Sequence, residues 1–166
     1  MRIFVLYSRK AYTASDFDIE NLEDYGRIDI IAQSLVQAIC LSYDKREDII
    51  FYSVMDGKPN APITIEFTSS ELKKVFPNEK FFAGKIKKAL ETYEKIRKEE
   101  ILVEDGIKVY KKDLIPILNL IKEKFNPKFF VLHEKGEEID KNIFEKINCF
   151  IIGDNLGIPH KLEKFI

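Results

Sequence analysis

Cysteine, histidine and tryptophan are scarce in this sequence, and their scarcity removes several classes of function. The 166 residues include two cysteines, two histidines and no tryptophan. Cys40 and Cys149 lie in apolar stretches with no neighbouring base, so we expect buried thiols in a reducing compartment, the cytoplasm. His133 and His160 lie far from each other and from both cysteines, so no metal site is predicted. Phosphate-cradling GxxxxGK and nucleophile-bearing GxSxG motifs are also missing.

Long apolar runs and an excess of one charge are likewise absent. No apolar run approaches the ~20 residues of a membrane-spanning helix, so no membrane partner is expected. Lys and Arg number 27 against 28 Asp and Glu, a formal net charge of -1 at pH 7. Any RNA-binding site must therefore be a local patch. Without repeats or linkers, residues 1–166 are predicted to form a single domain.

The remaining pattern alternates apolar strands with amphipathic helices. Five strands are predicted, at Arg2–Tyr7, Asp48–Met55, Ile63–Phe67, Phe129–Leu132 and Cys149–Ile152, of which the last two are expected to be buried. Helices are predicted from about Ile28 to Leu41, from the cap Asn78 to Arg97, from the cap Asp113 to Phe125, and in a short segment from Ile139 to Ile147. A hairpin is expected around Asp105-Gly106. This order favours a three-layer α/β domain with a mostly parallel sheet.

The most informative stretch is FIIGDNLGI, residues 150–158. It is an apolar strand that runs into a loop with two glycines, the place where open α/β sheets hold small ligands. Gly153 and Gly157 either present backbone amides to a ligand or only make a turn. Asp154 is either a helix N-terminal carboxylate or, as we favour, a residue that fixes the loop through side-chain to backbone bonds.

Several collinear stretches resemble the archaeal tRNA pseudouridine N1-methyltransferases of the SPOUT superfamily. The matching stretches are GRIDII, LSYDKREDIIFYSVMDGKPNAP, SSELKKVFPNEK, IKKAL, FVLHEKGE and FIIGDNLG. The resemblance implies a SPOUT-like α/β fold, S-adenosylmethionine as the methyl donor, tRNA as the partner and a homodimer. It also implies a C-terminal knot that holds the cofactor, with Leu132, Gly153 and Gly157 at positions matched to cofactor contacts. Without the family resemblance, Leu132 would be interpreted as a leucine of the hydrophobic core.

The sequence also departs from the family pattern. After Gly157 only nine residues follow, so we expect an incomplete C-terminal knot, a weak homodimer, weak cofactor binding and slow or undetectable methylation. Gln33 and Glu47 stand where the resemblance leads us to expect arginines, and Glu47 would repel RNA phosphate. Two function classes therefore remain: a methyltransferase, or a non-catalytic relative that binds RNA or a partner subunit.

Residues for chemistry and for RNA can be named from the same motifs. Methyl transfer from a sulfonium depends mostly on in-line positioning, while the nucleophilic nitrogen must lose a proton. Arg27 and Asp29, which open a predicted helix, are the catalytic candidates, with a helix N-terminal ion pair as the alternative. Arg46 and Lys45 are the RNA-binding candidates, with a solvated loop as the alternative. The lysines between 80 and 98 alternate with glutamates and are interpreted as an ordinary charged surface.

Overall fold

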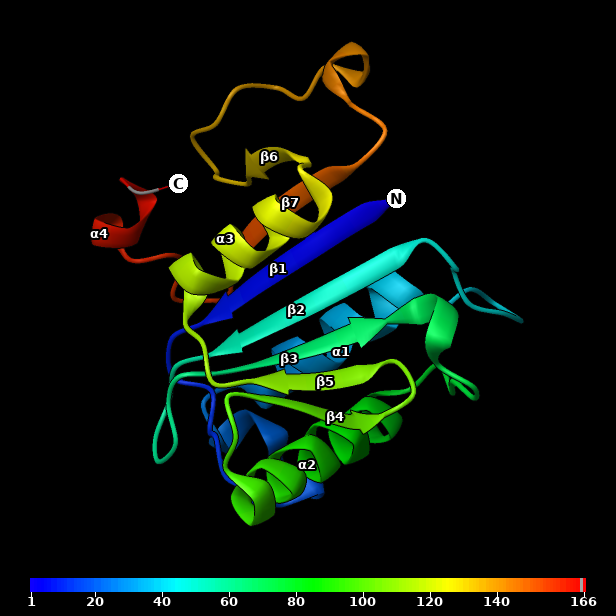
Figure 1. Ribbon diagram of the computed structural model, residues 1–166, viewed down its shortest axis with the longest axis vertical. Helices are drawn as coiled ribbons and strands as arrows, with labels where there is room; N and C mark the ends of the chain where they lie inside the picture. Colours follow the sequence, from blue (N-terminus) through cyan, green and yellow to red (C-terminus); the bar gives the residue numbers. More distant parts are fainter. Residues whose placement is uncertain (165) are drawn as a thin grey trace.

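Seven strands form one sheet with helices on both faces (Figure 1). The structure is a computed structural model that describes residues 1–164 and 166. The strands are β1 (Arg2–Ser8), β2 (Ile49–Met55), β3 (Ile63–Thr68), β4 (Glu100–Glu104), β5 (Ile107–Tyr110), β6 (Lys128–Val131) and β7 (Asn148–Gly153). Their order across the sheet is β4-β5-β3-β2-β1-β7-β6. All five strands predicted from the sequence therefore lie in one sheet.

The sheet is mixed, with most strands pointing the same way. β2, β1, β7 and β6 are parallel neighbours, whereas β3 pairs antiparallel with β2 and β5, and β4 pairs antiparallel with β5. Only β3 and β4 therefore run against the others. Since β1, β7 and β6 are parallel and in register, their carboxyl ends meet at one edge of the sheet, close to the C-terminus (Figure 1).

The main helices form the two outer layers. They are α1 (Ile28–Ile39), α2 (Glu79–Ile96) and α3 (Leu114–Phe125). The structure also has the short helix α4 (His160–Glu163) and the 3₁₀ turns η1 (Ile19–Asp24), η2 (Ser69–Glu71) and η3 (Lys141–Ile143). The predicted caps are confirmed: Asn78 Oδ1 accepts from Phe81 N at 2.8 Å, and Asp113 Oδ1 accepts from Leu114 N at 2.7 Å. These side chains satisfy amides that have no partner within the first helical turn.

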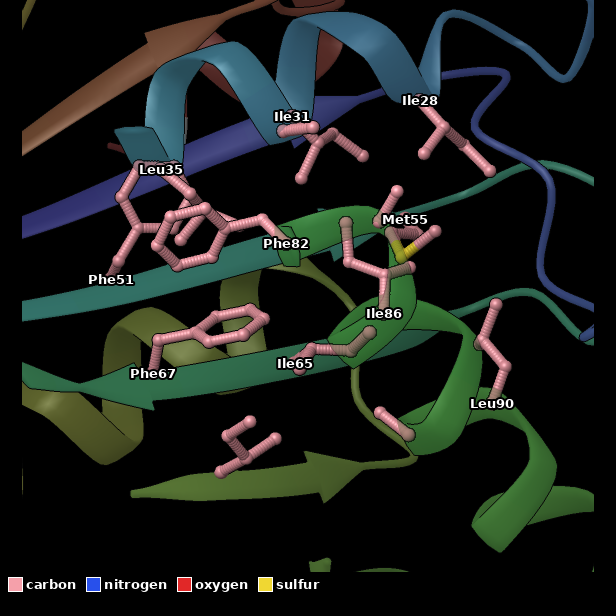
Figure 2. Close-up of a cluster of buried hydrophobic side chains, with 14 of the residues drawn as sticks. Ile28, Ile31, Leu35, Phe51, Met55, Ile65, Phe67, Phe82, Ile86 and Leu90 are labelled. Atoms are coloured by element: carbon pink, nitrogen blue, oxygen red, sulfur yellow. The ribbon is translucent and has the colours of Figure 1, made fainter. Parts of the chain in front are cut away.

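Apolar side chains pack on both faces of the sheet. Beneath α1 and α2, residues such as Ile31, Leu35, Phe82 and Ile86 are completely buried and pack against the strands (Figure 2). On the other face α3 packs through Leu114, Ile117, Leu118 and Ile121. Buried apolar groups at helical spacing thus produce the three layers that the sequence predicts.

Three sequence-based predictions are wrong in detail. The segment from Ile139 to Ile147 contains only the 3₁₀ turn η3, where Asp140 Oδ1 accepts from Asn142 N at 2.9 Å. β6 was expected to be buried, but it is an edge strand with partly exposed side chains. Cys40 is half-buried rather than buried. Cys149 is buried, and burial raises the pKa of its thiol to about 12, which makes it unreactive.

Candidate functional site

A pocket lies where β6 and β7 end and the following loops begin. Its volume is about 510 Å³, within the range of small-molecule sites. The segment from Ile152 to Ile158 forms one wall, Leu132 to Glu134 form another, and α4 closes the rim through His160 and Glu163. The structure therefore brings together Leu132, Gly153 and Gly157, the three residues that the family resemblance matched to cofactor contacts.

The two glycines shape the loop by their backbone geometry. A Cβ atom at Gly153 would lie 2.7 Å from the Cα and carbonyl carbon of Gly157, so the chain can fold back only over a residue without a side chain. Gly157 has φ of +71°, a conformation that favours glycine. Its N–H donates to the carbonyl of Asp154 at 2.9 Å, so this amide is used within the turn. Gly153 is thus required for the pocket wall, while Gly157 suits the backbone conformation of the turn.

Asp154 fixes the same loop, as the sequence predicts. Its Oδ1 accepts from Leu156 N at 3.0 Å, and its own N–H donates to the carbonyl of Tyr7 at 3.1 Å. Its Oδ2 is buried and has no hydrogen-bond partner within the described part of the chain. Burial raises the pKa of the Asp154 carboxyl, while the Leu156 amide and the guanidiniums of Arg9 and Arg27 act in the opposite direction.

Leu132 is not a core leucine. It follows β6, its side chain is 38 % exposed, and its N–H donates to the carbonyl of Ile151 at 2.9 Å. The interpretation based on the residue alone, without the family resemblance, is therefore wrong. Because Leu132 is held by the sheet yet partly exposed, it offers the pocket a fixed apolar surface.

The pocket rim also contains ionisable groups from segments that lie far apart in the sequence. The Nε2 of His133 lies 3.8 Å from one carboxylate oxygen of Glu163, and the Nδ1 of His160 lies 2.7 Å from the other. Glu134 and Asp154 add two further carboxylates to the lining. The three rim residues come from two segments about thirty positions apart, so sequence spacing gave no signal. The rim is consequently acidic when its histidines are neutral.

Arg27 and Asp29 form one rigid unit at the start of α1. Arg27 Nε and Nη2 each donate to one oxygen of Asp29 at 2.9 Å, and Asp29 is only 8 % exposed. Arg27 has φ of 65°, an uncommon left-handed conformation for a residue with a side chain. Its side chain is half-exposed, and the positive charge of its guanidinium acts to lower the pKa of the Asp154 carboxyl. Among the described residues that line the pocket, neither Arg27 nor Asp29 appears, so the predicted catalytic pair lies outside the pocket lining.

The predicted RNA-binding residues lie at the other end of α1. Arg46 Nη1 donates to the carbonyls of Gln37, Ala38 and Cys40 at 3.0–3.3 Å, which satisfies the last turn of the helix. Lys45 Nζ contacts Glu47 at 2.8 Å and the carbonyl of Ser69 at 2.6 Å. The 12 residues of α1 separate this end from Arg27 by roughly 18 Å. The structure thus does not bring the two predicted pairs together.

Fold and pocket together define an α/β domain with a pocket of small-molecule size at the carboxyl ends of parallel strands. The chain belongs to the family described as "Putative SAM-dependent RNA methyltransferase", whose family model matches residues 1–166. This assignment agrees with the family resemblance noted from the sequence motifs.

Similar proteins come from several archaea. A Methanocaldococcus jannaschii protein is 37 % identical over 173 residues, which cover 100 % of this chain and 82 % of that protein. A Methanococcus aeolicus protein is 38 % identical, covering 98 % and 82 %. A Pyrococcus abyssi protein is 34 % identical, covering 100 % and 84 %. All three are named tRNA (pseudouridine(54)-N(1))-methyltransferase.

Among the described residues, no helix is both long and apolar enough to cross a membrane. Residues 1–164 and 166 also contain no group of three His, Cys, Asp or Glu side chains arranged to hold a metal ion.

Proposed function

We propose that this chain transfers a methyl group from S-adenosylmethionine to N1 of a T-loop pseudouridine in tRNA, in the cytoplasm. The observation that carries the proposal is the pocket itself: in a chain of this methyltransferase family, Leu132, Gly153 and Gly157 converge where two parallel strands end. The names of the archaeal relatives support the choice of tRNA and of pseudouridine.

The lining of the pocket suits S-adenosylmethionine. Leu132, Leu156 and Ile158 offer apolar surface to an adenine ring, and Glu134 offers a carboxylate to ribose hydroxyls. The cofactor carries a net positive charge, from its sulfonium and ammonium groups less its carboxylate. Asp154, Glu134 and Glu163 therefore give the pocket a complementary charge. When bound, the cofactor supplies an electrophilic methyl group.

Arg27 and Asp29 would then serve the nucleophile. The N1 nitrogen of pseudouridine must lose its proton as the new bond forms, and negative charge develops on the ring. The guanidinium of Arg27 stabilises that charge, and the buried Asp29 holds the guanidinium in one orientation through two hydrogen bonds. In this scheme solvent water takes up the N1 proton, and the cofactor's sulfonium becomes a neutral thioether. Asp29 is only 8 % exposed and is paired with Arg27, so it positions the arginine.

Binding and chemistry are tested separately on the 166-residue chain. Calorimetry is expected to show S-adenosylmethionine binding that a Leu132→Asp substitution weakens at least ~10-fold, because the lost apolar surface and the added charge both oppose adenine binding. Mass spectrometry of tRNA incubated with protein and cofactor should show one added methyl on a T-loop pseudouridine. A tRNA with uridine at that position is the control, since its N1 is bonded to ribose. Binding of tRNA without cofactor binding would favour the non-catalytic RNA-binding or subunit-interaction alternative.

We also propose that the chain forms a homodimer through α1. Asp29 is the only charged residue of this helix, although charged residues make up 33 % of the chain. The outer side of α1 carries Ile30, Gln33, Ser34, Gln37 and Ala38, which line an apolar groove of about 460 Å³ against Phe4. Stacked rings continue this surface, with Phe150 lying 5.6 Å from Phe4 and 5.4 Å from Phe130. Depletion of charge is typical of the centre of an interface.

An Ala38→Glu substitution tests the proposed dimer. It places a charge at the centre of the neutral surface, so the dimer dissociation constant should rise at least ~10-fold. Sedimentation velocity across a concentration series measures this change, and Lys122→Glu on α3 is the control for altered charge. A wild-type chain that stays monomeric at high micromolar concentration would contradict the proposal.

A further inference from the structure

A second surface whose side chains are suited to ligand binding lies near the start of β2, at the end of the strands opposite to the pocket. Tyr43 is fully exposed there, and Phe76 is 56 % exposed. Two grooves that share Lys73 join these rings: one contains Tyr43, and the other contains Lys74 and Phe76. We call Tyr43, Lys73, Lys74 and Phe76 the aromatic–lysine edge. The segment with Tyr43 leads into the start of β2, whereas the pocket loop follows the end of β7. Because β2 and β7 both run parallel to β1, these segments lie at opposite ends of the strands (Figure 1).

Tyr43 is presented by a tight turn between α1 and β2. Leu41 N donates to the carbonyl of Asp44 at 2.8 Å, and Cys40 and Lys45 form an antiparallel bridge that closes the turn. The hydrogen bonds of Arg46 and Lys45 described above fasten the base of this turn to α1 and η2. A fully exposed aromatic ring on a fastened turn contributes nothing to the core, but it offers both of its faces to a planar ligand.

Phe76 is held in a comparable way. Its ring makes an edge contact with Phe81 at a centroid separation of 5.6 Å, and the amino group of Lys85 lies 5.4 Å from the centre of the Phe81 ring. Together these side chains line a groove of about 670 Å³. Leu72 anchors the preceding segment in the core, and Asn78 caps α2 immediately after it. The segment that carries Phe76 is therefore tied down on both sides.

The charge around these rings is locally positive. The groove with Phe76 contains three lysines against Glu104 and Asp105, a net charge of +1, although the whole chain has a net charge of -1. Lys85 is already paired with Glu104 at 3.0 Å, which leaves Lys73 and Lys74 as the cations available to a ligand. Lys74 is exposed and forms no ion pair with any described residue. Lys73 pairs with Asp105 at 2.9 Å, but these side chains are 82 % and 59 % exposed. Exposed pairs of this kind are weak, so an incoming phosphate group can replace the aspartate.

We propose that the aromatic–lysine edge is a second contact site for the RNA substrate. Tyr43 and Phe76 stack on unpaired bases, while Lys73 and Lys74 contact the flanking phosphates. Aromatic rings interleaved with cations are the arrangement by which proteins bind unpaired nucleotides. This inference rests on the proposed function, since it takes tRNA to be the substrate. The seven residues of β2 put this site roughly 20 Å from the methyl-donor pocket, so it would bind a part of the tRNA away from the modified base.

Fluorescence anisotropy with tRNA tests the proposal on the intact chain. The double variant Tyr43→Ala/Phe76→Ala should bind tRNA roughly 10- to 100-fold more weakly, because base stacking is lost. Tyr43→Phe keeps the ring and should keep the affinity. For the variant Lys73→Ala/Lys74→Ala, the slope of log Kd against the logarithm of salt concentration should fall by about one to two, because up to two phosphate contacts are lost. Lys122→Ala/Lys124→Ala, on the outer surface of α3, is the matched control with two lysines removed elsewhere.

Cofactor binding separates the possible failures. All these variants should bind S-adenosylmethionine as the wild type does, because none of the substituted residues lines the pocket. If the wild type binds tRNA and both edge variants match the α3 control, the inference is wrong while the proposed function stands. If the wild type binds no tRNA, the proposed function itself fails. If the Tyr43→Ala/Phe76→Ala variant loses as much affinity for duplex RNA as for single-stranded RNA, its rings do not stack on unpaired bases. The base-stacking part of the inference would then be wrong, and only the phosphate contacts would remain.

Discussion

Replacing Gly153 by alanine should weaken S-adenosylmethionine binding by ~100-fold or more. The added Cβ would lie 2.7 Å from two backbone atoms of Gly157, and backbone atoms cannot rotate away as a side chain can. The loop from Asp154 to Ile158 would have to move outward, and this loop is a wall of the pocket. Loss of several hydrogen bonds between this loop and the cofactor, at about 0.5–1.5 kcal/mol each, accounts for a decrease in affinity of this size.

Gly84→Ala is the matched control for this substitution. Gly84 lies within α2, and a Cβ built there has no atom within 4 Å. This variant should be more stable by about 0.5–1 kcal/mol, because alanine loses less backbone entropy in a helix. Its cofactor affinity should equal that of the wild type. A Gly153→Ala variant with unchanged affinity in calorimetry would show that the loop is not the cofactor wall.

The order of strands and helices was predictable because it depends on local patterns. The helix at Ile28 and the caps at Asn78 and Asp113 follow from apolar spacing and from the side chains that bond to the first free amides. The expected helix near Ile139 failed for a reason that is not local. Ile139 and Ile143 are partly exposed, and of the three apolar side chains only Phe144 makes ring contacts with the sheet, among the described residues, to Phe130 and Phe150. The contacts of one such side chain do not stabilise several helical turns.

The convergence at the pocket was also predictable, whereas its rim was not. Leu132 follows β6 and Gly153 ends the neighbouring parallel strand β7, and the ends of parallel strands lie together. The contacts of Glu163 with His133 and His160 depend instead on how a short helix folds back beside β6. Arg46 shows a similar limit: its sequence context suggested phosphate, but its guanidinium caps the carbonyl end of α1. Such partners are set by tertiary contacts.

Substituting Arg27 by alanine should lower the methylation rate constant by ~100-fold or more, with little change in S-adenosylmethionine affinity. A fixed hydrogen-bond donor that meets developing charge commonly contributes about 10²–10³ in rate. Arg27 is placed for this role by its two bonds to Asp29 and by the left-handed turn at the start of α1. Single-turnover methylation of tRNA measures the rate, and calorimetry measures the affinity.

Arg27→Lys separates charge from orientation. Lysine keeps the positive charge but cannot make the paired bonds that a guanidinium makes to one carboxylate, so it should recover only part of the lost rate. Asp29→Asn should also slow methylation, since the arginine loses its charged anchor while the methyl-donor pocket keeps its lining. Because Asp29 acts only through Arg27, the double variant Arg27→Ala/Asp29→Asn should be no slower than Arg27→Ala. Additive losses would show that Asp29 has a role of its own, and full activity of Arg27→Ala would assign the charge stabilisation to another group.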